Sequence, residues 1–218
     1  MKKRTEEPLV ICFGDSLTVG LTDGSPGSDV PYGRFLQEWL GSRGRVVIRG
    51  LCGELTSTMV ERFTRDVVNH KPDTVVILGG TNDLGHGVEP FAIAENLSRM
   101  YSQADKAGIQ AVGVTVPSIR PDQPLPSSGF SNSSESSLPE WIRPHISIRL
   151  LLNRRIEELC SERAIPCIDL FSETIEEPHR ILAAGFSSDG LHLTPKGYER
   201  FAKIVWEQVF ASQFGENG

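Results

Sequence analysis

Five short runs rich in valine and isoleucine alternate with longer segments whose apolar residues recur at helical spacing. The runs are Leu9–Phe13, Arg45–Arg49, Thr74–Leu78, Gln110–Val116 and Ile165–Leu170. Most of them lack the alternation of a half-solvated strand, which is typical of strands buried on both faces. Strands that alternate with helices are joined by right-handed crossovers and therefore run parallel. We expect an α/β fold, a three-layer α/β/α sandwich with a parallel five-stranded sheet.

The segments between these runs carry the signals of helix ends. Pro90 opens one of them and Gly108 closes it, and Thr194 precedes Pro195 as an N-cap precedes a proline at the first helical position. We expect helices over residues 32–42, 57–69, 90–107 and 146–163, and a last helix from residue 195 onward.

The length of 218 residues fits one domain spanning residues 1–218, with residues 1–7 as a flexible N-terminus. Residues 117–145 break the alternation, because prolines and a cluster of serines leave no periodic pattern. A loop of this length in a compact domain is a lid, a binding loop or a mobile insertion. Since it follows the fourth strand, it would lie over the rim that the carboxyl ends of the strands form. This pattern fits a loop that covers the substrate and equally a mobile insertion with no role.

Charge and cysteine usage narrow the class of protein. The formal net charge of −6 argues against nucleic-acid binding, which needs a basic surface. The apolar run after Lys2-Lys3-Arg4 is too short and too interrupted for a secretory signal, and no stretch is long enough to span a membrane. The four cysteines lack CxxC spacing, so we expect reduced, buried thiols, no metal site and a cytoplasmic location. They are Cys12, Cys52, Cys160 and Cys167.

A serine follows the first predicted strand in the turn Gly14-Asp15-Ser16-Leu17. Ligands of open α/β sheets bind outside the carboxyl ends of the strands, which is where Ser16 stands. Backbone N–H groups at such a strand-to-helix turn are unpaired and can meet a forming anion. Ser16 is therefore the candidate nucleophile, although a helix cap or a phosphate-loop serine would look the same in isolation.

A histidine with a nearby carboxylate precedes the last predicted helix, in Asp189-Gly190-Leu191-His192. The three-residue spacing lets a tight loop bring Asp189 onto one imidazole nitrogen and leaves the other free to face Ser16. A serine nucleophile needs such a base and such an orienting acid. The pattern predicts His192 as the general base and Asp189 as its partner.

Two further loops offer hydrogen-bond donors for an oxyanion. Asn82 follows the third strand through Gly79-Gly80, and Gly53 follows the second strand. We interpret Asn82 as a side-chain donor and Gly53 as a backbone donor, with Gly50 competing for the latter role. Asp83 is expected to cap the next turn.

These ordered blocks resemble the SGNH, or GDSL-type, esterase/lipase superfamily over nearly the whole chain. The resemblance implies a flavodoxin-like sandwich, a triad of Ser16, Asp189 and His192, and an oxyanion hole formed by the Ser16 N–H, the Gly53 N–H and the Asn82 amide. It implies neither a metal nor an organic cofactor.

The implied activity is hydrolysis of small carboxylic esters, with short-chain acyl, aryl or acetyl groups, through an acyl-enzyme. Lysophospholipase, thioesterase and carbohydrate acetylesterase activities are alternatives at the same site, with a small-molecule ester as partner in each case. An alternative of another class is a flavin- or phosphate-binding module, in which Ser16, Thr18 and Thr22 would contact a phosphate. The oligomeric state is left open.

Overall fold

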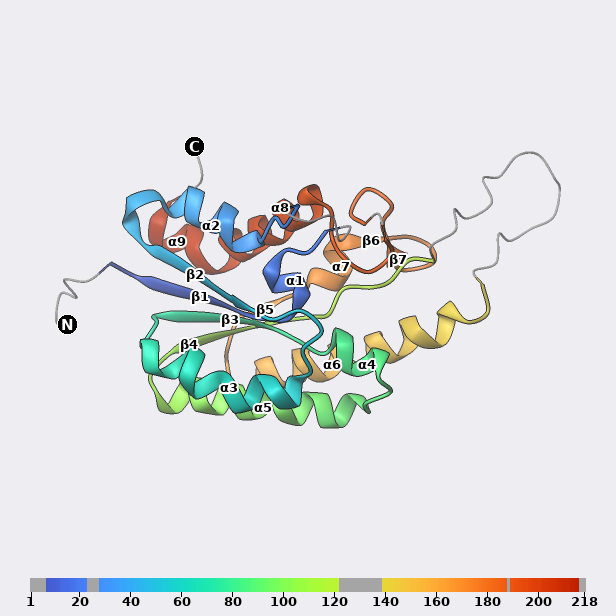
Figure 1. Ribbon diagram of the computed structural model, residues 1–218, viewed down its shortest axis with the longest axis horizontal. Coiled ribbons are helices and arrows are strands. Elements are labelled where there is room, and N and C mark those ends of the chain that lie inside the picture. The colour runs from blue at the N-terminus through green and yellow to red at the C-terminus, as the bar shows by residue number, and fades with distance from the viewer. Residues whose placement is uncertain (1–6, 23–27, 122–138, 188, 216–218) are drawn as a thin grey trace.

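The computed structural model describes residues 7–22, 28–121, 139–187 and 189–215, and these form three layers with a sheet in the middle (Figure 1). The sheet is parallel with the strand order β2-β1-β3-β4-β5, which confirms the predicted α/β architecture. This order is that of flavodoxin-like folds. The strands are β1 (Leu9–Gly14), β2 (Arg45–Gly50), β3 (Thr74–Leu78), β4 (Gln110–Val114) and β5 (Cys167–Ile168).

Helices cover both faces of the sheet (Figure 1). One face carries α2 (Tyr32–Leu40), α8 (Pro195–Val205) and α9 (Ala211–Phe214), and the other carries α3 (Thr56–Asp66), α5 (Pro90–Lys106) and α6 (Ile142–Glu162). Shorter elements lie between them: α1 (Ser16–Val19), α4 (Thr81–Gly85), α7 (Leu170–Thr174), a two-stranded hairpin of β6 (Ile175–Glu176) and β7 (Ile181–Leu182), the 3₁₀ turns η1 (Gly41–Arg43) and η2 (Val68–His70), and a π-helical turn, η3 (Trp206–Phe210).

The sheet register brings the ends of the three strands nearest the N-terminus to one level. Gly14, the last residue of β1, lies opposite Gly50 of β2 and Leu78 of β3. A Cβ atom on Gly14 would lie 2.2 Å from the Leu78 carbonyl oxygen, so the chain needs glycine there. The loops after β1, β2 and β3 therefore begin side by side.

Burial explains the lack of alternation in the strands. All five residues of β3 are buried, because helices pack on both of its faces. On the α8 side, the Tyr32 and Phe201 rings pack with centroids 4.0 Å apart. The helix start predicted at Thr194 is confirmed, since its hydroxyl accepts a hydrogen bond from the Gly197 N–H at 3.3 Å.

Two strands end earlier than predicted, because side chains form hydrogen bonds with the backbone beyond their last residues. Beyond β4, the Asn153 amide of α6 accepts from the Val116 N–H at 2.8 Å and donates to the Val116 carbonyl at 2.9 Å. Beyond β5, Asp169 accepts from the Ser172 N–H at 3.0 Å and so begins α7 instead of continuing the strand.

The predicted loop over residues 117–145 is wrong at its end, because α6 begins at Ile142 and not near residue 146. Pro144 is the third residue of this helix, where a missing N–H costs no intrahelical hydrogen bond. The remainder of the expected lid, residues 122–138, and the first six residues of the expected flexible N-terminus lie outside the described residues.

All four cysteines are free thiols, but the expected burial holds only in part. Cys12 and Cys160 are buried and Cys167 is half-buried, whereas Cys52 is exposed. The expectation for Cys52 was wrong because it lies in the turn after β2, beyond the cover of the helices. In the described ranges, none of the helices is long and apolar enough to cross a membrane.

Candidate active site

The predicted site residues follow neighbouring strands at the point where the strand order reverses. β1 has β2 on one side and β3 on the other, and ligands of open α/β sheets bind outside the carboxyl ends of the strands at such a point. Ser16 begins α1 directly after β1, Gly53 lies in the loop after β2, and Asn82 lies in α4 after β3. Because the register aligns these strand ends, residues more than 60 positions apart in the chain reach the same rim.

Ser16, His192 and Asp189 form a continuous series of hydrogen bonds. The Ser16 Oγ lies 3.1 Å from the His192 Nε2, and the His192 Nδ1 lies 2.7 Å from the Asp189 Oδ2. Since an ionised carboxylate only accepts, the Nδ1 atom carries the proton and the Nε2 lone pair faces the serine hydroxyl. The structure thus brings together the three residues that the sequence predicted as nucleophile, base and acid.

The loop that carries the histidine is fixed by the same aspartate. The Asp189 Oδ1 accepts from the N–H groups of Leu191 at 2.9 Å and His192 at 2.7 Å, and from the Ser187 hydroxyl at 3.3 Å. Burial alone would raise the pKa of Asp189, but the hydrogen bonds from Leu191 and His192 outweigh it, and the pKa lies below its usual value. The carboxylate is therefore ionised at neutral pH and can stabilise a positively charged imidazole.

Three hydrogen-bond donors lie in the loops around Ser16. The Asn82 Nδ2 donates to the Glu54 carbonyl oxygen at 3.0 Å and lies 3.4 Å from the Asp15 Oδ2. Gly53 has a φ of +72°, and within the described part of the chain neither its N–H nor that of Ser16 has a protein acceptor. Such unpaired N–H groups can bind a developing anion.

Packing distinguishes Gly50 from Gly53, the two glycines considered for the backbone donor. A Cβ on Gly50 would lie 2.7 Å from the Val19 nitrogen and 2.8 Å from the Asp15 carbonyl oxygen, so this glycine packs beneath α1. Gly53 is exposed, and a Cβ built on it meets nothing within 4 Å. Gly50 is a packing glycine, whereas Gly53 has the open surroundings that a ligand needs.

Asp83 does not cap the turn that follows it, contrary to the prediction. Its buried carboxylate accepts from the Thr56 hydroxyl at 2.6 Å and from the Thr56 N–H at 3.0 and 3.1 Å. It therefore caps the first turn of α3, which lies 27 positions earlier in the chain, and it makes no contact with the triad. Sequence spacing gave no signal for a cap from another element.

Three charged residues at the site were missed by the sequence reasoning. Asp15 is fully buried as the N-cap of α1, and Glu54 and Arg62 form a buried ion pair behind the loop of Gly53. A signal for Arg62 existed in the sequence, because it lies on the same helical stripe as Met59 and Phe63. A charged residue on an apolar stripe indicates a buried partner.

The alternative of a phosphate loop does not fit the geometry. The Thr18 hydroxyl is buried, and its oxygen lies 2.4 Å from where a Gly14 Cβ would stand. Thr22 bonds to Ser28 at 2.8 Å, and Ser16 is engaged with His192. These hydroxyls therefore do not converge on one anion.

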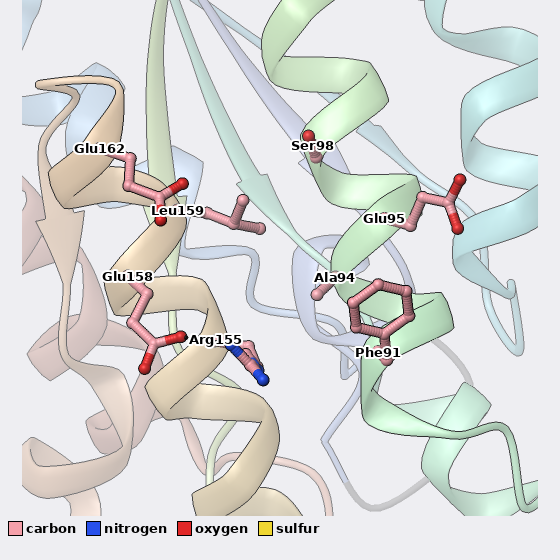
Figure 2. A pocket seen from close by; sticks show the side chains of 8 residues that line it. All are labelled: Phe91, Ala94, Glu95, Ser98, Arg155, Glu158, Leu159 and Glu162. Carbon is pink, nitrogen blue, oxygen red and sulfur yellow. Dashed lines mark hydrogen bonds and ion pairs between the residues drawn. The ribbon is translucent and has the colours of Figure 1, made fainter.

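A pocket between α5 and α6 lies apart from these residues (Figure 2). It has a volume of about 270 Å³ and is lined by Phe91, Ala94 and Leu159 together with charged residues such as Glu158. None of the predicted site residues lines it. Across the described ranges, no three histidine, cysteine or carboxylate side chains gather as a metal site would require.

Comparisons with known proteins show the family of the chain. The model of the GDSL-like lipase/acylhydrolase family matches residues 12–200. A curated relative, the uncharacterized lipoprotein YqeF of Bacillus subtilis strain 168, is 26% identical over 92% of this chain and 87% of its own length.

Solved structures share the fold at lower identity. A GDSL-like lipase from Bacteroides thetaiotaomicron is 21% identical with a TM-score of 0.69, covering 91% of this chain and 86% of its own. A catalytic mutant of an acetylxylan esterase from Geobacillus stearothermophilus is 18% identical with a TM-score of 0.73, and the match covers 96% of this chain and 97% of the esterase chain. A carbohydrate acetylesterase family member from Sinorhizobium meliloti is 19% identical with a TM-score of 0.70, and the match covers 96% of this chain and 100% of that chain. Because the family model spans most of the chain, this protein belongs to the GDSL-like lipase/acylhydrolase family.

Proposed function

We propose that the protein is a serine esterase that hydrolyses small carboxylic esters through an acyl-enzyme. The observation that carries this proposal is the series of hydrogen bonds from the Ser16 Oγ through the His192 imidazole to the Asp189 carboxylate, at 3.1 and 2.7 Å. These distances lie within the range at which a base takes a proton from a nucleophile.

In the first half of the reaction, the Ser16 Oγ attacks the ester carbonyl carbon and its proton moves to the His192 Nε2. The tetrahedral intermediate then collapses, the alcohol leaves with the proton that His192 returns, and the acyl group stays on Ser16. Asp189 holds the imidazole in place and stabilises its transient positive charge.

In the second half, a water molecule takes the place of the alcohol. His192 removes a proton from the water, the resulting hydroxide attacks the acyl carbon, and the same proton returns to the Ser16 Oγ as the carboxylic acid leaves. Every proton transfer in this cycle takes place between Ser16, His192, the substrate and water. The enzyme thereby returns to its starting state.

The oxyanion of each tetrahedral intermediate would be bound by the N–H groups of Ser16 and Gly53 and by the Asn82 amide. Among the described residues neither backbone N–H has a protein acceptor, which supports this assignment. The Asn82 amide donates to the Glu54 carbonyl oxygen at 3.0 Å and, over a longer distance of 3.4 Å, to the Asp15 Oδ2. The shorter bond fixes the amide, and the N–H of the longer bond would turn to the substrate oxyanion. Donors that are fixed in advance stabilise a transition state without the cost of reorganisation.

We propose short acyl groups, acetyl among them, as the substrate class. Two of the solved relatives are named as esterases of acetylated carbohydrates, and the present chain matches them over nearly its full length. Lysophospholipids and thioesters are the alternatives, and they differ in acyl length and leaving group. A cytoplasmic location is part of the proposal as well.

The test is hydrolysis of p-nitrophenyl esters from acetate to laurate by the wild type, Ser16→Ala and His192→Ala. We expect activity that falls with acyl length and disappears in both variants. Acetylated xylooligosaccharides and a lysophospholipid serve as natural-type substrates in the same series. Full activity of Ser16→Ala would refute the mechanism, and a maximum at long chains would refute the short-acyl assignment.

A further inference from the structure

An arginine is buried directly behind the loops of the candidate oxyanion hole. The Arg62 side chain on α3 is 6% exposed and that of its partner Glu54 is 7% exposed. The Arg62 Nε donates to the Glu54 Oε1 at 2.7 Å, and its Nη2 donates to the Glu54 Oε2. The guanidinium carbon also lies 4.1 Å from the centroid of the Phe13 ring. The guanidinium is thus fixed in both position and orientation.

The same guanidinium contacts the backbone at the ends of two strands. Its Nη2 donates to the carbonyl oxygens of Gly14 at 3.1 Å and of Arg49 at 3.2 Å. Gly14 ends β1 two residues before Ser16, and Arg49 lies near the end of β2 before the loop that holds Gly53. Arg62 therefore joins the loop of the nucleophile to the loop of the second backbone donor.

Glu54 extends this connection to the third donor. Its carbonyl oxygen accepts from the Asn82 Nδ2 at 3.0 Å, while its side chain is held by Arg62. On the far side, the Arg62 Nη1 donates to Asp66 of the same helix at 3.1 Å. One arginine and one glutamate thus connect all three loops to α3.

We propose that Arg62 and Glu54 are positioning residues that set the geometry of the oxyanion hole. The proposal rests on the proposed function, since it concerns the same hole. A buried ion pair is costly to form and often contributes less to stability than apolar residues of the same volume. The Arg62–Glu54 pair lies between three donor loops and forms directional hydrogen bonds to each of them. An apolar pair could not form these bonds.

The catalytic consequence follows from the distances that such a hole requires. Donors stabilise an oxyanion when they lie about 2.7–3.1 Å from it, and a misplacement of about 1 Å can cost about 100-fold in rate. Loosening the loops should therefore lower kcat, whereas KM should change little because the ground-state carbonyl depends less on the hole.

The experiment compares Arg62→Lys with Arg65→Lys on p-nitrophenyl acetate. Lysine keeps the charge at residue 62 but cannot reach Glu54 and both carbonyl oxygens at once. Arg65 lies on the same helix, its side chain is 72% exposed, and it pairs only with Asp66 among the described residues, so it is the matched control. We expect kcat to fall about 10- to 100-fold in Arg62→Lys with KM within threefold, and both to stay unchanged in Arg65→Lys.

A second readout separates misalignment of the hole from general loss of structure. Replacing the ester carbonyl oxygen by sulfur weakens the hydrogen bonds that the hole can make, so a well-aligned hole favours the oxygen ester. The measured quantity is kcat for the oxygen ester divided by kcat for its sulfur analogue. We expect this ratio to fall towards 1 in Arg62→Lys and in Asn82→Ala, and to remain at the wild-type value in Arg65→Lys. Circular dichroism identifies the folded variants. If Arg62→Lys does not fold, Glu54→Gln decides the question by the same two readouts.

The outcomes distinguish this proposal from the proposed function. An inactive Ser16→Ala together with an Arg62→Lys whose kcat and oxygen-to-sulfur ratio match those of Arg65→Lys would overturn the positioning role and leave the esterase intact. An active Ser16→Ala would overturn both.

Discussion

Asp15 offers the sharpest stability prediction, because its carboxylate is fully buried next to the nucleophile. The pKa of Asp15 is raised from 3.8 to about 7, mainly by burial and to a smaller extent by the nearby carboxylates of Asp83 and Glu54, although a hydrogen bond from the Leu17 N–H lowers it. Replacing Asp15 by asparagine keeps an oxygen that can accept this hydrogen bond and removes the titrating proton. The asparagine NH2 would face the Asn82 Nδ2, which now donates to the Asp15 Oδ2 at 3.4 Å, and this adds a cost that does not depend on pH. The pH-dependent part of the change in stability therefore reports the loss of one ionisable group.

The sign and size follow from proton linkage. Between about pH 4 and pH 7 the folded protein holds a proton on Asp15 that the unfolded chain has lost, so this group lowers the free energy of unfolding as the pH rises. A shift from 3.8 to about 7 corresponds to a loss on the order of 4 kcal/mol once the pH exceeds 7. Asp15→Asn lacks this loss and should gain stability relative to the wild type across the same window.

Urea unfolding at pH 4, 5.5, 7 and 8 measures the effect. We expect the difference in unfolding free energy, variant minus wild type, to rise with pH by up to about 4 kcal/mol and to level off above pH 7. Asp105→Asn removes an exposed carboxylate from α5 and controls for the loss of a charge of the same sign. A difference that is constant with pH, or that falls as the pH rises, would refute the reasoning.

Three further substitutions separate catalysis from stability. Asn82→Ala should lower kcat about 100- to 1000-fold, measured with p-nitrophenyl acetate, because it removes one oxyanion donor, and an unchanged kcat would contradict that role. Asp83→Ala should lower the free energy of unfolding in urea by about 2–5 kcal/mol, because it leaves the Thr56 hydroxyl and N–H without their carboxylate; a loss below 0.5 kcal/mol would argue against the cap. Asn153→Ala should cost about 2–4 kcal/mol by the same measurement, since it leaves the buried N–H and carbonyl of Val116 unpaired, and a loss of kcat without a loss of stability would contradict this structural role.

Much of the fold could be predicted because its signals are local. A strand buried on both faces is a continuous apolar run, and β3 has the predicted bounds, Thr74–Leu78. Helix ends marked by Pro90 and by Thr194-Pro195 were placed to within a residue. These signals depend on residues that are neighbours in the chain.

The differences arise where a side chain from another element replaces a backbone partner. The Asn153 amide ends β4 before Val116, and Asp83 caps α3 from α4. The short helices α1, α4 and α7 are too brief to show a period and were not predicted. Such features depend on the tertiary fold and leave no pattern in a window of sequence.

The residues of the candidate triad could be predicted from the sequence, but the residues that hold the surrounding loops in place could not. Ser16, Asp189 and His192 stand in turns with recognisable spacing, and the structure places them within hydrogen-bond distance. The apolar stripe of α3 indicates that Arg62 has a buried partner, but no motif identifies Glu54 as that partner, because the contact forms only where three loops meet.

The most direct test of the account is to find which residue a fluorophosphonate modifies. This reagent reacts with serine hydroxyls that a neighbouring base has activated, and mass spectrometry of peptides locates the adduct. The account predicts one phosphonyl group per chain on Ser16, with labelling abolished in Ser16→Ala and lowered strongly in His192→Ala. An adduct on another residue, or labelling of Ser16 that is unchanged in His192→Ala, would contradict the claim that Ser16 is the activated nucleophile.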